Sequence, residues 1–157
     1  MAKEELFRSS VVAYFLNSFG AFPVGKGRQD RKALLKAQQV LADGQALVIF
    51  PEGMRSQSRR LKLAFPGAAL IASRSGATII PVGITGTEKM EGMAWLWRRP
   101  QITVNIGEAF TLPPLTGRPT KFELSKLTDV IMGHIAEVLP VEYHGHCRDG
   151  RLNVVEG

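Results

Sequence analysis

The sequence contains little cysteine and no long apolar run. Cys147 is the single cysteine among 157 residues, so a disulfide framework is excluded and a reducing compartment is expected. No apolar stretch approaches the roughly 20 residues that a membrane-spanning helix needs. The first six residues, Met1–Leu6, include three charged side chains, which is atypical of a secretory signal peptide. We therefore expect a soluble or peripheral chain, unless an anchor precedes it.

Acidic residues are also scarce relative to basic ones. Fourteen Asp and Glu face twenty Lys and Arg, which gives a formal net charge of +6. A basic protein favours anionic partners, which include nucleic acids, phosphate-bearing substrates and anionic membranes. The chain has no basic patch interleaved with aromatic residues and no zinc-ligand spacing. We therefore expect neither a nucleic-acid partner nor a bound metal.

The apolar residues that are present follow helix and strand periodicities in alternation. Helical patterns cover residues 3–19, 30–43, 66–74 and 121–138. Residues 46–50 and 77–84 are apolar runs typical of strands buried on both faces, and residues 102–106 alternate like a half-exposed strand. This order predicts the α/β class, as a single layered domain with a mixed sheet flanked by helices. We place the domain at residues 1–140 and a polar C-terminal tail at residues 141–157.

The loop at residues 50–56 carries the strongest sequence signal for a ligand site. It reads Phe50-Pro51-Glu52-Gly53-Met54-Arg55-Ser56 and follows a predicted buried strand, where ligands bind in open α/β sheets. Gly53 would let the backbone approach a ligand, and the Arg55 guanidinium suits a phosphate. Glu52 would orient that arginine or accept a hydrogen bond from a substrate hydroxyl. The alternative is a solvated turn, but its position after a strand argues against it.

Two further segments are candidates for the walls of the same site. Lys26 and Arg28 flank a glycine and could meet an anion, although a basic connector on a basic protein explains them equally well. Residues 79–84 have no reactive side chain, and we expect them to shape a wall. Pro81, near the end of its strand, indicates a sheet edge or a bulge.

These segments together resemble the family of acyltransferases that acylate glycerol 3-phosphate and lysophosphatidic acid. Residues 50–56 resemble the third motif of that family, with Met54 where Thr is usual. Residues 20–26 resemble the second motif, with Lys26 where Arg is usual, and residues 79–84 resemble the fourth. The stretch at residues 2–7 is similar to the one that follows the first motif. The resemblance covers nearly the whole chain in order.

The resemblance implies acyl transfer from acyl-CoA or acyl carrier protein to a phosphorylated glycerolipid, without a cofactor, at the inner face of a membrane. It implies that Lys26, Arg28 and Arg55 hold the acceptor phosphate beside Phe50, Pro51, Glu52, Gly53 and Pro81. The catalytic base of the family is a His that four residues separate from an Asp, and the pair is expected upstream of Ala2 together with the domain's N-terminal elements. Because that pair is absent here, the catalytic residues are unknown, and a non-catalytic lipid- or phosphate-binding remnant is the alternative.

Three features of the C-terminal half need separate interpretation. His144 and Asp149 repeat the spacing of the missing pair, but they follow Leu139-Pro140 near the chain end, so we favour a polar tail over a relocated dyad. His134 lies in the last predicted helix and is expected to be a surface or packing residue. The segment at residues 93–99 places Trp95 and Trp97 beside arginines, which favours a membrane interface over a packed loop.

Overall fold

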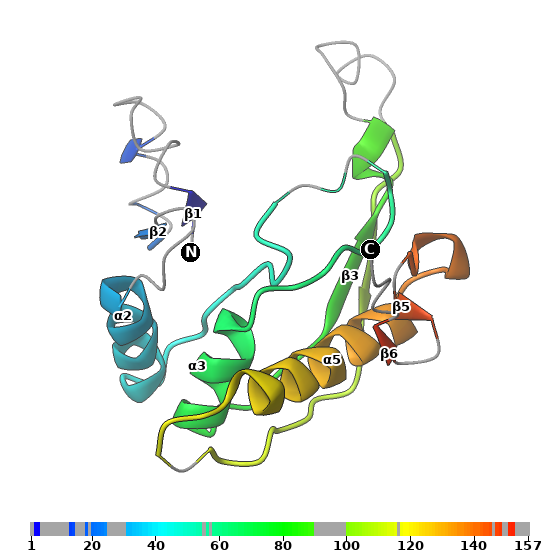
Figure 1. The fold of residues 1–157 in the computed structure, drawn as a ribbon. Helices are drawn as coiled ribbons and strands as arrows, with labels where there is room; N and C mark the ends of the chain where they lie inside the picture. The colour runs from blue at the N-terminus through cyan, green and yellow to red at the C-terminus, as the bar shows by residue number, and fades with distance from the viewer. Residues whose placement is uncertain are drawn as a thin grey trace. The chain divides into compact units, whose positions relative to one another are not determined.

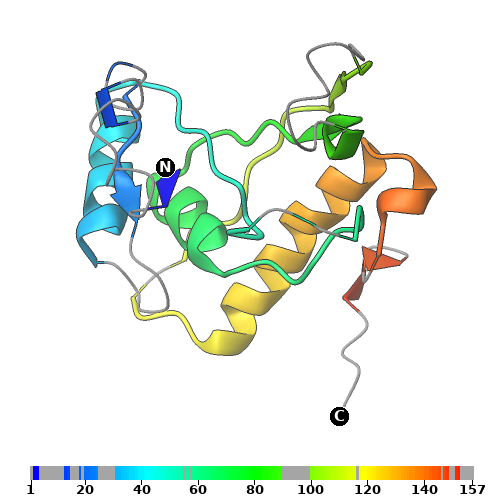
Figure 2. The same ribbon diagram turned by 90° about the horizontal axis from the view of Figure 1, so that it is seen from above.

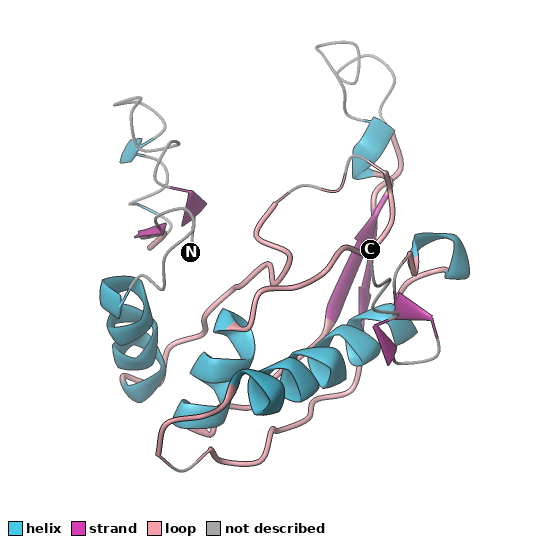
Figure 3. Cartoon of the chain, in the orientation of Figure 1, coloured by secondary structure: helices cyan, strands magenta, loops and turns pink. Residues whose placement is uncertain are grey.

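The computed structural model describes most of the chain from Arg31 onward. The described residues are 2–3, 13–14, 18, 20–24, 31–54, 56, 58–89, 100–115, 117–145, 147–148 and 151–152. They divide into two compact units, residues 1–49 and residues 50–157, which are considered separately. Figure 3 shows that helices and strands both contribute, so the predicted α/β class is confirmed.

The described residues of the first unit include a short parallel strand pair and helix α2. Strand β1 (Ala2–Lys3) pairs in parallel with β2 (Pro23–Val24), and helix α2 spans Arg31–Ala42. The predicted helix at 3–19 therefore does not include Lys3, although Ala13, Tyr14 and Ser18 are helical. Helix α2 agrees with the prediction, because its apolar positions recur at helical spacing and bury Ala33 and Ala37.

Residues 46–50 do not form the predicted buried strand. They adopt no strand conformation, and the side chains of Val48 and Phe50 are 68% and 66% exposed. A continuous apolar run indicates burial on two faces only when neighbouring strands cover both. Such strands do not surround this segment within the described residues.

The second unit is built around one long helix. Helix α5 spans Lys121–Glu137 and packs against both helix α3 (Gly67–Ser75) and strand β3 (Val82–Thr85), as Figures 1 and 2 show. A capping box starts α5: Thr120 Oγ1 accepts from the Glu123 amide, and the Glu123 carboxylate accepts from the Thr120 amide. Both helices agree with the sequence pattern.

Strand β3 pairs antiparallel with β4 (Thr103–Ile106), so that Val82 lies opposite Ile106 and Ile84 opposite Val104. These four side chains share one face of the pair and are 41–70% exposed. On the other face the Asn105 side chain donates to the Val138 carbonyl at the end of α5. The predicted strand at 77–84 is therefore shorter than expected and buried on one face, while the predicted strand at 102–106 is confirmed.

Short elements complete the second unit. Among the described residues, Thr87–Lys89 form the 3-10 helix η2 and Val141–Tyr143 form the 3-10 helix η3. Strand β5 (Cys147–Arg148) pairs antiparallel with β6 (Arg151–Leu152). The described strands thus pair in three separate two-stranded sheets, where the sequence predicted one mixed sheet. No helix in the described part of the chain has the length and apolarity to cross a bilayer.

The core of the second unit consists of two clusters on the buried side of α5. Leu61 packs with Met132 and Ala136, and the partly buried Ile135 lies against this cluster and against a second one. The second cluster contains Ala69, Ala72, Leu112 and Ile131. Met132 is fully buried. The loop that contains Leu61 is therefore attached to α5 through the contact of Leu61 with Met132.

Met132 is the largest fully buried side chain among the described residues, so its truncation should lower the stability of the fold strongly. Met132→Ala should lower the free energy of unfolding by about 2–5 kcal/mol, because a large core side chain is lost and a cavity remains. Val130→Ala, at a position on the same helix that is 44% exposed, is the matched control and should change stability by less than about 1 kcal/mol. Urea unfolding of both variants measures the difference. Equal losses at the two positions would contradict this packing.

Candidate functional site

The loop after Ile49 closes on the segment that follows it. The Gly53 amide donates to the Phe50 carbonyl over 3.0 Å, which turns the chain. The Phe65 amide donates to the Pro51 carbonyl over 2.9 Å, and the Lys62 amide donates to Glu52 Oε2 over 2.9 Å. Residues 50–53 are therefore held by a return segment, residues 61–65, rather than by a strand.

Glu52 lies at the centre of this arrangement. Its partial burial raises the pKa of the carboxyl group above the ordinary value of 4.5, and the Lys62 amide bond and the Lys62 positive charge offset this only in part. The carboxylate has one oxygen bonded to the Lys62 amide, which leaves its second oxygen able to accept from a ligand hydroxyl. The sequence identified Glu52 but not Lys62, since the two are ten residues apart and no local pattern joins them.

Gly53 has the backbone conformation that the turn requires. Its φ angle is +64°, a region in which a side chain is strained. A Cβ built there would lie 3.0 Å from the Phe65 ring, so the ring occupies the space beside the turn. The predicted role of Gly53 as a point of close backbone approach is compatible with this geometry.

The rest of the loop forms a second small turn stabilised by Ser56. The Ser56 hydroxyl donates to the Arg60 carbonyl over 2.7 Å and accepts from the Arg60 amide over 3.1 Å. Met54 Sδ lies 4.0 Å from the Lys62 ammonium, a weak contact at the position where the family motif usually has Thr. Arg55, which is between Met54 and Ser56 in the sequence, lies outside the described residues.

The other predicted phosphate-binding residues cannot be placed. Lys26 and Arg28 lie outside the described residues, as does the segment with Trp95 and Trp97. Their roles therefore stay predictions. Within the loop, the structure brings Phe50, Pro51, Glu52 and Gly53 together in one turn.

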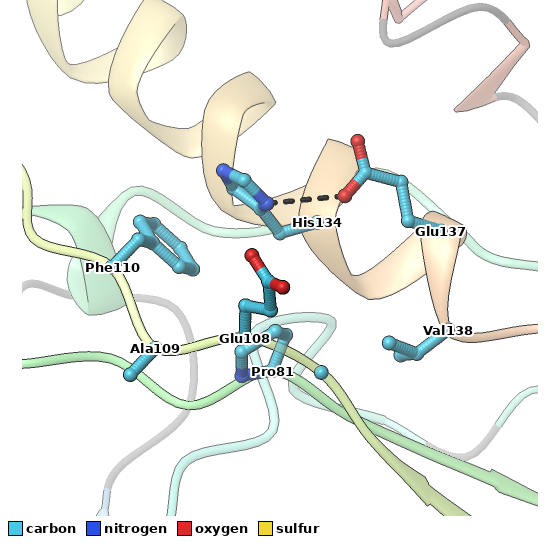
Figure 4. A pocket seen from close by; sticks show the side chains of 8 residues that line it. Pro81, Glu108, Ala109, Phe110, His134, Glu137 and Val138 are labelled. Carbon is cyan, nitrogen blue, oxygen red and sulfur yellow. Dashed lines mark hydrogen bonds and ion pairs between the residues drawn. The ribbon is translucent and has the colours of Figure 1, made fainter.

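Pro81 lines a different cavity, of about 330 Å³. Figure 4 shows Pro81 and Val138 at this cavity, together with Glu108, Phe110, His134 and Glu137. The residues that line it do not include residues 50–53. Pro81 is buried directly before β3, and its carbonyl accepts from the Gly107 amide over 2.9 Å. It thus starts the strand and shapes a wall, but not a wall of the loop.

The charges around this cavity do not suit a phosphate. His134 Nδ1 lies 3.2 Å from Glu137 Oε2, and the His134 ring stacks on Phe110 with ring centroids 4.0 Å apart. Glu108 adds a second carboxylate. Two carboxylates and one imidazole repel an anion more than they attract it. His134 is thus a packing residue, as the sequence predicted, and the loop remains the better candidate for phosphate binding.

His144 contacts the backbone through one of its two ring nitrogens. Its Nε2 lies 2.9 Å from the Leu139 carbonyl, and because a carbonyl oxygen only accepts, Nε2 carries the proton. Asp149 lies outside the described residues, so the pairing of the two stays untested. Among the described side chains, no group of three or more His, Cys, Asp or Glu could hold a metal ion.

Comparison with known proteins finds relatives of this chain. The family model described as "Acyltransferase" matches residues 1–85, which include the loop and Pro81. A protein of Bacillus subtilis (strain 168) named 1-acyl-sn-glycerol-3-phosphate acyltransferase is 28% identical over 139 residues, 88% of this chain and 67% of the relative. A protein of the same name from Streptococcus pneumoniae (strain ATCC BAA-255 / R6) is 32% identical over 108 residues.

The Streptococcus match covers 68% of this chain and 38% of that relative. The chain therefore spans about two thirds of the first relative and well under half of the second. A chloroplastic enzyme of Arabidopsis thaliana with this name is 26% identical over 92 residues, 57% of this chain and 26% of the relative. No solved structure matches the chain significantly.

The pKa of Glu52 predicts a specific pH dependence of stability. Because the folded pKa lies above the unfolded value, the stabilisation is complete below the unfolded pKa and is lost as pH rises through the folded one. Glu52→Gln removes the titration and keeps an oxygen for the Lys62 amide. The wild type should therefore lose stability relative to Glu52→Gln as pH rises from 4.5, the ordinary value, through the raised pKa of the Glu52 carboxyl. Urea unfolding across this range measures it, and a difference that grows in the opposite direction would refute the burial of this carboxyl.

Gly53→Ala should distort the turn by strain and by contact with Phe65. The positive φ alone costs about 1–2 kcal/mol for a residue with a Cβ. Gly117→Ala is the matched control, because Gly117 has a φ of +75° and open space around its Cβ position. Chemical denaturation should show a larger loss for Gly53→Ala than for Gly117→Ala. Equal losses would mean that the Phe65 ring does not support the turn.

Proposed function

Because the chain belongs to the acyltransferase family, we propose that it forms the acceptor-binding part of an enzyme of phospholipid biosynthesis. The proposed enzyme moves a fatty acyl group from acyl-CoA or acyl carrier protein to a hydroxyl of lysophosphatidic acid or glycerol phosphate. The family match to residues 1–85 carries this proposal. The relatives named 1-acyl-sn-glycerol-3-phosphate acyltransferase support the choice of acceptor.

In this proposal the loop at residues 50–56 binds the acceptor. Arg55 supplies two parallel N–H donors that match a phosphate, and Lys26 and Arg28 add positive charge. The free oxygen of Glu52 accepts from a glycerol hydroxyl and so orients the backbone of the acceptor. The turn at Gly53 lets the acceptor approach the main chain, and a net charge of +6 attracts anionic lipids to the protein.

The transfer itself needs a general base. The acceptor oxygen forms a bond to the thioester carbonyl carbon, the carbon–sulfur bond breaks, and the hydroxyl proton ends on the thiol that leaves. A general base that removes this proton contributes about 10²–10⁴-fold in rate. We assign this step to the His and Asp of the first family motif rather than to His144 and Asp149, which lie in the polar C-terminal segment.

A membrane surface is the proposed location of the reaction. The acceptor is a lipid, and the sequence places Trp95 and Trp97 beside Arg98 and Arg99. Tryptophan and arginine together suit the boundary between headgroups and acyl chains. The protein would then act as a peripheral enzyme on the cytoplasmic side, with the acyl thioester arriving from solution.

The second candidate is a lipid- or phosphate-binding protein without catalysis. It is favoured by the absence of the His-x4-Asp motif between Ala2 and the loop. A transfer assay with lysophosphatidic acid and an acyl thioester distinguishes the two. Transfer that appears when a segment with the motif is joined upstream supports the enzyme. Binding without transfer in that longer protein supports the second candidate, and transfer by these 157 residues alone would contradict our assignment of the base.

Arg55 provides the most direct test of acceptor binding. Arg55→Ala should weaken binding to phosphatidylcholine vesicles that contain lysophosphatidic acid by about tenfold or more, because charge-assisted hydrogen bonds to the phosphate are lost. Arg118→Ala removes the same charge from an exposed position outside the loop and should change binding by less than about twofold. Vesicle co-sedimentation measures both.

Vesicles in which phosphatidylglycerol replaces lysophosphatidic acid control for general attraction to anionic lipids. With these vesicles the two arginine variants should behave alike. If Arg55→Ala and Arg118→Ala weaken binding to lysophosphatidic acid equally, the loop does not recognise the acceptor phosphate.

A further inference from the structure

The return segment that holds Glu52 is itself attached to a part of the chain far along the sequence. Its first residue, Leu61, is buried against Met132 and Ala136. The Leu61 amide donates to the Tyr143 carbonyl over 2.7 Å. The next residue, Lys62, donates to the Glu52 carboxylate. Tyr143 therefore holds Leu61, the neighbour of the residue whose amide binds the Glu52 carboxylate.

Tyr143 is fixed in turn by its own side chain. Its hydroxyl donates to Glu88 Oε1 over 2.9 Å, across 55 residues of sequence. Its amide donates to the Pro140 carbonyl over 2.9 Å within η3. Gly145 lies so close to the return segment that a Cβ on this residue would be 2.5 Å from the Leu61 carbonyl oxygen. The segment at 140–145 is thus packed onto the return segment.

Glu88 connects this attachment to the strand that follows Pro81. It lies in η2, which Gly86 alone separates from β3. Two motifs that the sequence predicted to form the acceptor site, residues 50–56 and residues 79–84, are therefore joined through Tyr143. Neither contains Tyr143 or Glu88, and neither residue was identified from the sequence.

The protonation of the pair suits a permanent hydrogen bond. Hydrogen bonds from the Glu88 backbone and from the Tyr143 hydroxyl keep the pKa of the Glu88 carboxyl below its ordinary value. The nearby positive charge of Arg59 acts in the same direction. The hydrogen bond to Glu88 raises the pKa of Tyr143. Around neutral pH the phenol therefore keeps its proton, and the ionised Glu88 carboxylate accepts the hydrogen bond from it.

We infer that Tyr143 and Glu88 are positioning residues for the acceptor-binding loop: their hydrogen bond holds the Leu61–Lys62 backbone where the Lys62 amide orients the Glu52 carboxylate. The pair touches no substrate in this scheme and acts through Lys62 alone. This inference rests on the proposed function for its consequence in binding, but the mechanical link can be measured without any ligand.

Tyr143→Phe is the decisive variant, because it removes only the hydroxyl and leaves the backbone bond to Leu61. We expect amide hydrogen exchange at Lys62 and Phe65 to become faster by on the order of fivefold or more, the size expected for loss of one such hydrogen bond. Exchange at Ile131 and Met132 in the middle of α5 should stay unchanged. Glu88→Ala should reproduce the effect, whereas Glu88→Gln, which keeps an accepting oxygen, should restore it toward wild type.

Glu142→Ala is the matched control, since Glu142 is an exposed carboxylate on the same 3-10 helix. It should leave exchange at Lys62 unchanged. If Tyr143→Phe lowers the melting temperature but leaves exchange at Lys62 and Phe65 unchanged, the pair is merely structural and the inference is wrong. Unchanged exchange together with an unchanged melting temperature overturns it as well.

A binding measurement separates this inference from the proposed function. With vesicles that contain lysophosphatidic acid, Tyr143→Phe should weaken binding while Glu142→Ala does not. If the wild type binds no phosphorylated acceptor at all, the proposed function fails, yet faster exchange at Lys62 would still establish the positioning role. If the wild type binds and Tyr143→Phe binds equally well despite faster exchange, the role in acceptor binding is refuted.

Discussion

A loop that presents its backbone and one carboxylate to a ligand needs contacts outside the loop to hold these groups in place. Here the hydrogen bond between the Lys62 amide and Glu52 does this, because it fixes the carboxylate and closes residues 50–62 into one structure. Leu61 connects the same segment to the core through Met132 and Ala136. The position of the candidate site thus depends on α5, although no residue of α5 belongs to the loop.

The electrostatics of the second unit separate the two places where a ligand could bind. The cavity beside Pro81 has Glu108 and Glu137 in its walls and His134 stacked on Phe110, so it disfavours phosphate. The loop has one carboxylate, the Lys62 charge and, in sequence, Arg55. The family motifs and the charges therefore both favour the loop over the cavity as the proposed acceptor site. The face of β3 and β4 formed by Val82, Ile84, Val104 and Ile106 remains apolar and exposed.

The sequence predicted local features well and long-range ones poorly. Helices α2, α3 and α5 follow from apolar spacing, because a helix is decided by residues three and four apart. The run at 46–50 carries a strand pattern, yet a strand needs a partner, and no pattern within five residues specifies one. The contacts of Lys62 with Glu52 and of Tyr143 with Glu88 were missed for the same reason, since they join residues 10 and 55 positions apart. Glu52 and Gly53 were found because a glycine turn after an apolar run is a local signal.

The central claim is that a phosphorylated acceptor binds at residues 50–62. It is tested most directly by titrating the isotopically labelled chain with glycerol 3-phosphate and following every backbone amide by NMR, with glycerol as the ligand that lacks the phosphate. The account predicts that glycerol 3-phosphate shifts the amides of the loop, Gly53 and Lys62 among them, and that glycerol does not. Shifts confined to the cavity around Glu108, Phe110 and His134, with the loop unmoved, would contradict it.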